Sequence, residues 1–283
     1  GSKIGISCYP THGGSGVVAT ELGKHLARMG HETAFISFSS PLRLSELPAG
    51  VSIHEIQDDI FPFKQYPYTL ALASKMAEIA RLKKLQVIHA HYAIPFAVAA
   101  ILARQIVPEL NLKVVTTLHG TDITLVGSHS SMHIITTYAI NASDAVTAVS
   151  NYLKRETYRI FNVKRDIEVI YNFIDMEHHS GPVSPSVPAP RKPGQPTVMH
   201  ISNFRPLKRV GDVIEVFARI RREVDARLLL VGDGPESMKA ERMVRDLDLA
   251  DAVEFIGVVD DVAPFLAAAD LLPELSAEPA DGR

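Results

Sequence analysis

The sequence predicts an α/β protein with parallel sheets, divided into two domains of similar design. Short, largely apolar runs alternate with stretches of helical periodicity, a pattern typical of parallel strands covered by helices on both faces. A proline-rich stretch at 180–196 lacks this pattern, and the alternation restarts after it. The chain has 283 residues, which is enough for two domains. We therefore predict domains at 3–178 and 197–283, joined by a linker or exposed loop at 179–196.

The first domain is expected to alternate strands and helices throughout. We predict strands at 3–8, 33–38, 51–56, 86–90, 113–118, 145–149 and 167–171. We predict helices at 16–29, 69–82, 95–106 and 131–140, and a further helix that begins after the N-terminal cap Ser150. The helix at 16–29 places Val18, Leu22 and Leu26 on one stripe and ends at Gly30.

The second domain repeats the alternation over a shorter length. Strands are expected at 197–201, 227–231 and 253–256, and helices at 207–224, 235–247 and 262–268. A further strand is expected at 270–272, and the polar residues 273–283 show no helical pattern. A doubly wound sheet normally has five or six strands. The expectation is therefore that this domain is truncated in this chain, or unusual.

Charge and cysteine content argue against several classes of partner. The formal net charge of −3 predicts no nucleic-acid partner and no electrostatic binding to membranes. The longest apolar stretch, 93–103, contains Pro95 and is too short to cross a bilayer. The single cysteine, Cys8, lies in the first predicted strand, where a small buried hydrophobe is the favoured interpretation. A reducing, cytoplasmic location fits a chain without internal disulfides.

Four polar loops follow strands of the first domain. They lie at 13–16, 91–92, 119–122 and 150–151. Because ligands of parallel sheets bind outside the carboxyl ends of the strands, we expect these loops along one edge. Gly14 and Gly16 flank Ser15 at a strand-to-helix turn, where free N–H groups suit an anion. The spacing is not that of a dinucleotide site, and a tight turn without a ligand is the alternative.

His119 and Asp122 form a candidate site in the loop after the strand at 113–118. The imidazole can serve as a hydrogen-bond partner or proton carrier, with the carboxylate orienting it; a structural histidine is the alternative. His89 and His91 point to one face of a strand, and together with His119 they raise the question of a zinc site. Their spacing differs from that of zinc ligands and no cysteine assists, so no metal is expected.

A basic loop opens the first helix of the second domain. Arg205, Lys208 and Arg209 lie where a helix dipole disfavours cations, which predicts a bound anion such as a diphosphate. A solvated basic loop is the alternative. Gly232 and Gly234 follow the next strand at the same predicted edge, where they become candidate nucleotide contacts.

Together these motifs resemble retaining glycosyltransferases of the GT-B fold. The turn at 13–16, the His-Gly-Thr-Asp loop at 119–122, the basic loop at 205–209 and Gly-Asp-Gly-Pro at 232–235 follow the order of that family. Stretches at 8–10, 89–95, 116–124, 171–175 and 200–205 extend the resemblance over nearly the whole chain. It implies two Rossmann-like domains facing across a cleft, the first binding the acceptor and the second the nucleotide sugar.

The resemblance also implies a reaction. N-acetylglucosamine would pass from UDP-GlcNAc to the hydroxyl of L-malate with retained configuration, the first step of bacillithiol biosynthesis. His119 would bond the sugar near its reacting carbon, while Arg205 and Lys208 would hold the diphosphate without a metal or other cofactor. The other residues expected to bind substrate are Gly14, Ser15, Gly16, Tyr92, Thr117, Asp122, Asn151, Asn203, Arg209, Gly232 and Gly234. For Thr117, an ordinary strand residue is an equal alternative.

One departure from the family keeps other functions open. The family carries paired glutamates after the strand that matches 270–272, where they bind the uridine ribose and the donor sugar. Glu274 and Glu278 lie near this place without the glycine-rich loop that should follow, so that role is assigned to neither. A chain without these groups is expected to bind the UDP-sugar poorly. The alternatives are a related enzyme that uses a sugar phosphate or inositol phosphate, and a truncated, inactive ligand-binding form; homo-oligomers stay open.

Overall fold

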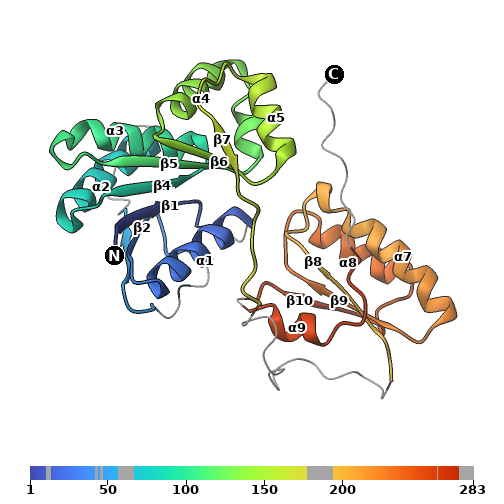
Figure 1. Ribbon diagram of the computed structural model, residues 1–283. Helices are drawn as coiled ribbons and strands as arrows, with labels where there is room; N and C mark the ends of the chain where they lie inside the picture. Colours follow the sequence, from blue (N-terminus) through green and yellow to red (C-terminus); the bar gives the residue numbers. More distant parts are fainter. Residues whose placement is uncertain are drawn as a thin grey trace. The chain divides into compact units, whose positions relative to one another are not determined.

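The computed structural model describes residues 1–10, 14–41, 44, 47–56, 67–176, 194–259 and 261–273. The chain divides into two compact units, Gly1–Phe173 and Ile174–Arg283. Each unit has a parallel sheet and its own helices (Figure 1). Most of the predicted linker at 179–196, together with Glu274 and Glu278, lies outside the described residues.

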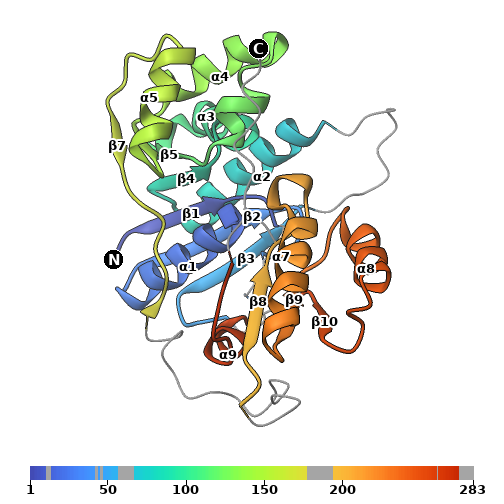
Figure 2. The ribbon, with the colours of Figure 1, turned by 90° about the vertical axis from the view of Figure 1, so that its right-hand side faces the viewer.

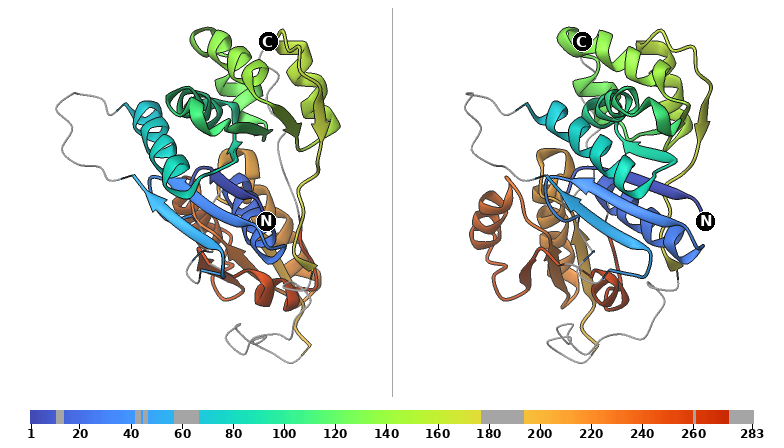
Figure 3. Two further views of the ribbon diagram at one scale, coloured as in Figure 1. Left: turned by 60° about the vertical axis from the view of Figure 1, so that its left-hand side comes forward. Right: turned by 90° about the vertical axis from the view of Figure 1, so that its left-hand side faces the viewer.

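The first unit contains a seven-stranded parallel sheet in the order β3-β2-β1-β4-β5-β6-β7 (Figure 3). Its strands are β1 (Lys3–Ser7), β2 (Glu32–Ser37), β3 (Val51–Glu55), β4 (Val87–His91), β5 (Lys113–Leu118), β6 (Ala145–Ala148) and β7 (Ile167–Val169). The chain first builds outward from β1 to β3 and then returns to place β4 on the other side of β1. The sheet order therefore reverses between β1 and β4, which is where such sheets bind ligands.

Helices cover both faces of this sheet. They are α1 (Gly14–Arg28), α2 (Tyr68–Lys83), α3 (Val98–Ile106), α4 (Ser130–Ala142) and α5 (Asn151–Ile160), with short turns η1 (Ala93–Ala97), η2 (Pro108–Leu110) and η3 (Asp122–Val126). Alternate residues of β2 enter two different cores because successive side chains of a strand point to opposite faces. Ala34 and Ile36 pack in the core that contains α2 and α3, whereas Phe35 packs with Ala19 of α1.

The second unit has a three-stranded parallel sheet in the order β10-β9-β8 (Figure 2). Its elements are β8 (Thr197–Ile201), η4 (Pro206–Lys208), α7 (Val210–Glu223), β9 (Arg227–Val231), α8 (Ser237–Asp246), β10 (Val253–Gly257) and α9 (Ala263–Ala267). Leu228 and Leu230 of β9 pack toward α7 and α8, while Leu229 packs toward α9. The expected strand at 270–272 is present only as a single parallel bridge between Leu271 and Val198.

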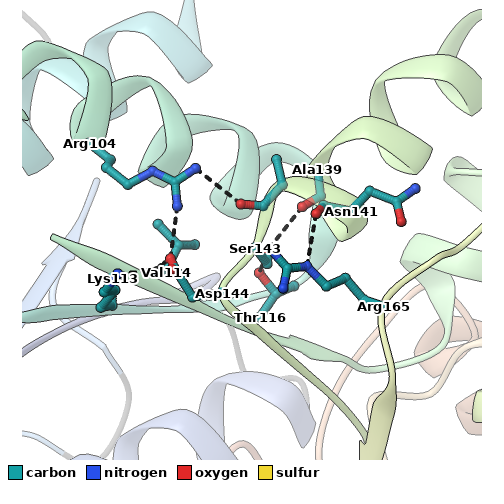
Figure 4. A network of polar contacts seen from close by, with 10 residues as sticks. Arg104, Lys113, Val114, Thr116, Ala139, Asn141, Ser143, Asp144 and Arg165 are labelled. Carbon is teal, nitrogen blue, oxygen red and sulfur yellow. Dashed lines mark hydrogen bonds and ion pairs between the residues drawn. The ribbon is translucent and has the colours of Figure 1, made fainter. Parts of the chain in front are cut away.

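A polar network fixes the connection from β5 through α4 to β6 (Figure 4). The Asp144 carboxylate accepts a hydrogen bond from the Val114 backbone N–H at 2.9 Å and pairs with Arg104 of α3 at 2.8 Å. The hydroxyls of Thr116 and Ser143 lie 2.8 Å apart beneath it. Burial opposes ionisation of Asp144, but the bond from Val114 and the nearby cations outweigh it and lower its pKa. This network holds β6 in register beside β5.

The largest differences between predicted and observed helices are at two helix starts. The helix expected at 95–106 becomes regular only at Val98, after the wide turn η1, and Ile94 before Pro95 is extended. Similarly, α7 begins at Val210, after the short turn η4 and after Arg209, whose φ of 49° is left-handed.

The environment of Cys8 and the apolar character of the helices also follow the sequence. Cys8 is buried, 1% exposed, as predicted, and burial raises the pKa of its thiol to about 12. No helix among the described residues is both long enough and apolar enough to span a bilayer.

Candidate functional site

The four polar loops of the first unit do share one edge of the sheet. They follow β1, β4, β5 and β6, which are consecutive neighbours in the sheet order. Because the four strands are parallel, their carboxyl ends lie side by side. We call this the carboxyl edge, and the prediction that it gathers the candidate residues of the first unit is confirmed.

The glycines at the start of α1 are helical. Gly14 and Gly16 lie in the first turn of α1 rather than in a turn before it, and neither has a positive φ. The predicted helix began at Gly16, so only the helical state of Gly14 differs from the expectation. The helix N-terminus that they open still offers backbone N–H groups without intrahelical partners. Gly13 lies outside the described residues.

Tyr92 links the loop after β4 to α1. Its hydroxyl donates to Ser15 Oγ at 2.9 Å, and its ring lies 5.1 Å from the His119 ring and 5.4 Å from the Tyr9 ring. Its φ of 91° is unusual for a residue other than glycine, and such strain is often found at functional sites. Tyr9, half-exposed at the same edge, was not among the predicted site residues, although its place directly after the first strand was a signal.

Three histidines form a stack between β4 and the end of β5. The His91 ring lies 4.5 Å from the His89 ring and 5.1 Å from the His119 ring, with nearly parallel planes. Nδ1 of His91 is 2.9 Å from Nε2 of His119. Burial lowers the pKa of His89 and of His119 to about 4, and it lowers the pKa of His91 well below its ordinary range. The three imidazoles are therefore neutral at physiological pH.

Hydroxyl groups hold the other side of this stack. Thr117 Oγ1 lies 2.7 Å from His89 Nε2 and 2.8 Å from Thr147 Oγ1. The hydroxyl of Thr117 is therefore used inside the sheet, and its proposed contact with substrate stays a prediction. His89 bonds Thr117 while His91 and His119 bond each other, so the nitrogens do not converge on one point as zinc ligands would.

Asp122 anchors the loop after β5. Its buried carboxylate accepts hydrogen bonds from the backbone N–H groups of Ala93 at 3.0 Å, Gly120 at 3.0 Å and His119 at 3.2 Å. Burial raises the pKa of Asp122 to about 6, and these bonds only partly oppose that rise. The predicted orientation of His119 by Asp122 thus acts through the backbone and not through the imidazole. Direct contact of Asp122 with substrate stays a prediction.

In the loop after β6, the side chains of Ser150 and Asn151 form hydrogen bonds within the first unit. Ser150 caps α5 as predicted, its Oγ accepting from the Leu153 backbone N–H at 3.1 Å. Asn151 is exposed and donates from Nδ2 to the Tyr171 hydroxyl at 2.9 Å. The role of Asn151 in binding substrate stays a prediction.

The basic loop of the second unit contains two cations, Arg205 and Lys208, without an ion-pair partner among the described residues. Arg209 forms an ion pair with Asp212 in the first turn of α7. Arg205 and Lys208 are exposed and form no ion pair with any described residue. The charge of these two side chains is therefore available to a bound anion, whereas that of Arg209 is already compensated.

The glycines after β9 pack against the loop after β8. Gly232 has a φ of 119°, and a Cβ at this position would overlap the carbonyl oxygen of Ser202. A Cβ on Gly234 would overlap the carbonyl oxygen of Asn203. The Oδ1 atom of Asn203 is buried and has no hydrogen-bond partner among the described residues. Glycine is thus required here by backbone packing, and nucleotide contacts of these residues stay predictions.

Comparison with known protein families matches both units. The family described as Glycosyltransferase Family 4 matches residues 12–178, and the one described as Glycosyl transferases group 1 matches 195–274. The chain is 47% identical over 277 residues to N-acetyl-alpha-D-glucosaminyl L-malate synthase of Bacillus anthracis. The aligned residues cover 97% of this chain and 72% of that protein. It is 25% identical to an uncharacterized glycosyltransferase of Methanocaldococcus jannaschii, covering 76% of this chain and 56% of that protein.

Solved structures of similar fold include a glycosyltransferase and a protein in complex with UDP and glucose. Anabaena HepE in complex with UDP and glucose has a TM-score of 0.72 at 20% identity, covering 98% of this chain and 75% of that one. A glycosyltransferase from Rickettsia africae has a TM-score of 0.70 at 21% identity, covering 98% of this chain and 74% of that one. At this level of identity the similarity establishes the fold.

We predict that Gly234→Ala lowers the free energy of unfolding of the second unit by about 1–3 kcal/mol, because the added methyl group overpacks the Asn203 carbonyl. Urea unfolding followed by circular dichroism measures the effect. Gly211→Ala is the matched control: the nearest atom to its new Cβ would be Met243 Sδ at 3.4 Å, and alanine favours the helix by about 1 kcal/mol. Equal stability of Gly234→Ala and the unaltered protein would contradict the packing argument.

We also predict that the first unit loses stability as the pH falls from about 6.5 to about 4. In this window the unfolded chain protonates the imidazoles of His89, His91 and His119, whose pKa values are lowered in the folded state. Asp122 acts in the opposite sense, because its pKa rises from 3.8 to about 6 on folding. Three imidazoles outweigh one carboxyl group, so the net effect of lowering the pH is a loss of stability of the first unit.

Urea midpoints across this pH range measure the acid sensitivity. His119→Gln removes one of the three imidazoles and should make the loss smaller. A midpoint that does not change between pH 6.5 and pH 4 would show that the stack is not held neutral by burial.

Proposed function

The chain belongs to glycosyltransferase family 4, and on that premise we propose that it transfers N-acetylglucosamine from UDP-GlcNAc to the hydroxyl of L-malate. This reaction is the first step of bacillithiol biosynthesis, and we place it in the cytoplasm. The observation that carries the proposal is the 47% identity, over 97% of this chain, to an N-acetyl-alpha-D-glucosaminyl L-malate synthase.

Arg205 and Lys208, which form no ion pair with any described residue, support a role of the second unit in binding the diphosphate. The guanidinium of Arg205 can bond two phosphate oxygens at once, and Lys208 adds a compact positive charge. Negative charge develops on the UDP leaving group as the bond to the sugar breaks, and fixed cations stabilise that charge. In this proposal the two side chains do the work for which other enzymes use a metal ion, so no cofactor is needed.

The carboxyl edge of the first unit supports binding of sugar and malate. Malate carries two carboxylates, and the open N-terminus of α1 suits one of them. Ser15 and Tyr92 stand beside that helix end, joined by their hydrogen bond of 2.9 Å. We assign these hydroxyls to malate and His119 to the donor sugar near its reacting carbon.

Retention of configuration is proposed to occur by displacement on one face of the sugar. The bond between the anomeric carbon and the phosphate oxygen breaks, and the malate hydroxyl oxygen forms the new bond. The malate proton passes to the departing phosphate oxygen. Catalysis then depends on positioning the two substrates and on stabilising the leaving group.

The acceptor is tested by UDP release from UDP-GlcNAc in the presence of L-malate, a sugar phosphate or inositol phosphate. L-malate should support the fastest release, because paired carboxylate sites differ in shape and charge from a phosphate site. Faster release with either phosphate would favour the related enzyme with another acceptor. Malate binding without UDP release would favour the inactive ligand-binding form.

The same assay tests the basic loop. Arg205→Gln and Lys208→Gln should each lower kcat by about a hundredfold, because each removes a charge that stabilises the leaving diphosphate. Arg222→Gln is the matched control, because Arg222 is exposed on α7 of the same unit and its substitution removes the same positive charge. Equal effects of all three substitutions would indicate a general loss of positive charge rather than a diphosphate site.

A further inference from the structure

The hydrogen bond between His91 and His119 limits where each ring can carry its proton. His91 Nδ1 and His119 Nε2 are 2.9 Å apart, and burial lowers the pKa of both side chains. Each neutral imidazole has one N–H and one lone pair. One ring therefore donates and the other accepts, which leaves two possible arrangements.

The second nitrogen of His91 decides between them. His91 is 1% exposed, and its Nε2 has no hydrogen-bond partner among the described residues. If His119 donated, the proton of His91 would lie on this buried Nε2 without an acceptor. Buried N–H groups without acceptors are rarer in proteins than buried acceptors without donors. The favoured arrangement therefore has the His91 proton on Nδ1, in the bond to His119.

We propose that His91 is a positioning residue, which donates from Nδ1 to His119 Nε2 and so holds His119 as the tautomer protonated on Nδ1. The stack supports this fixed geometry, because the His91 ring is packed between the rings of His89 and His119. The arrangement follows from contacts within the first unit. Its consequence for catalysis rests on the proposed function.

The fixed tautomer specifies what His119 offers to a bound molecule. His119 is half-exposed, and none of the described residues bonds its Nδ1. This nitrogen carries the proton, so His119 presents a donor to an oxygen acceptor, such as a sugar hydroxyl or a phosphate oxygen. It has no free lone pair with which to take the proton of the attacking hydroxyl. His119 therefore orients the sugar and is not the general base.

Long-range proton–nitrogen correlation spectra of the protein labelled with nitrogen-15 histidine test the tautomer directly. The chain has 12 histidines, and the signals of His119 are assigned by their loss in His119→Gln. At neutral pH we expect the shift of a protonated nitrogen at Nδ1 of His119 and that of a bare nitrogen at Nε2. The reverse pattern would overturn the proposal, whether or not the protein transfers a sugar.

Two substitutions of His91 separate hydrogen bonding from packing. His91→Asn can keep an N–H near the position of Nδ1, whereas His91→Phe keeps an aromatic ring in the stack without any donor. We expect His119 to retain its tautomer in His91→Asn and to shift toward protonation on Nε2 in His91→Phe. Circular dichroism establishes that both variants fold, and the spectrum of the unaltered protein tests the tautomer even where they do not. An unchanged tautomer in folded His91→Phe would overturn the proposal.

UDP release adds the functional readout. His91→Phe should lower kcat about tenfold, a size typical of residues that orient a ligand-binding histidine, with a smaller change in KM for UDP-GlcNAc. His91→Asn should recover most of this loss. Equal loss in both variants would overturn the positioning role. If the unaltered protein releases no UDP with any acceptor, the proposed function fails, while the spectra still decide the tautomer.

Discussion

The first unit depends on one buried carboxylate that joins the ends of two strands. Asp122 accepts from the backbone of Ala93, just after β4, and from His119 and Gly120, just after β5. A carboxylate can bind two loops at once in this way because its two oxygens offer several lone pairs. The raised pKa of Asp122 shows that burial of the charge is only partly compensated. The fold bears this cost at the place where the candidate site is built.

The unusual backbone of Tyr92 and the histidine stack are consistent with this anchor. Tyr92 lies between β4 and the residue that Asp122 holds, so its positive φ is supported from both sides. The same anchor fixes the backbone of His119, and the side-chain bond to His91 then fixes its ring. The backbone and the side chain of His119 are thus held by separate groups.

Much of this could be predicted from the sequence, and the remainder depends on contacts that no local pattern encodes. The apolar runs predicted the strands, and the rule for parallel sheets predicted the shared carboxyl edge; the GT-B resemblance is confirmed by the family match. The helical state of Gly14 was missed because glycine permits many conformations and does not select one. The grouping of His89, His91 and His119 was raised only as a question of zinc binding, and the hydrogen bond between His91 and His119 was not predicted because it depends on the register of β4 against β5. The packing of Gly232 against the Ser202 carbonyl was also not predicted, and a nucleotide contact of Gly232 stays a prediction.

The protonation states of the first unit bear on the path of the transferred proton. A general base at neutral pH must be unprotonated and have a lone pair within reach of the attacking hydroxyl. Asp122 is ionised above its pKa of about 6, but its oxygens are occupied by backbone N–H groups. His119 is neutral, and its Nε2 lies against His91. Neither group is free to take the proton from malate. In the proposed reaction the departing phosphate gains negative charge as it leaves and becomes the more basic partner, which favours displacement on a single face of the sugar.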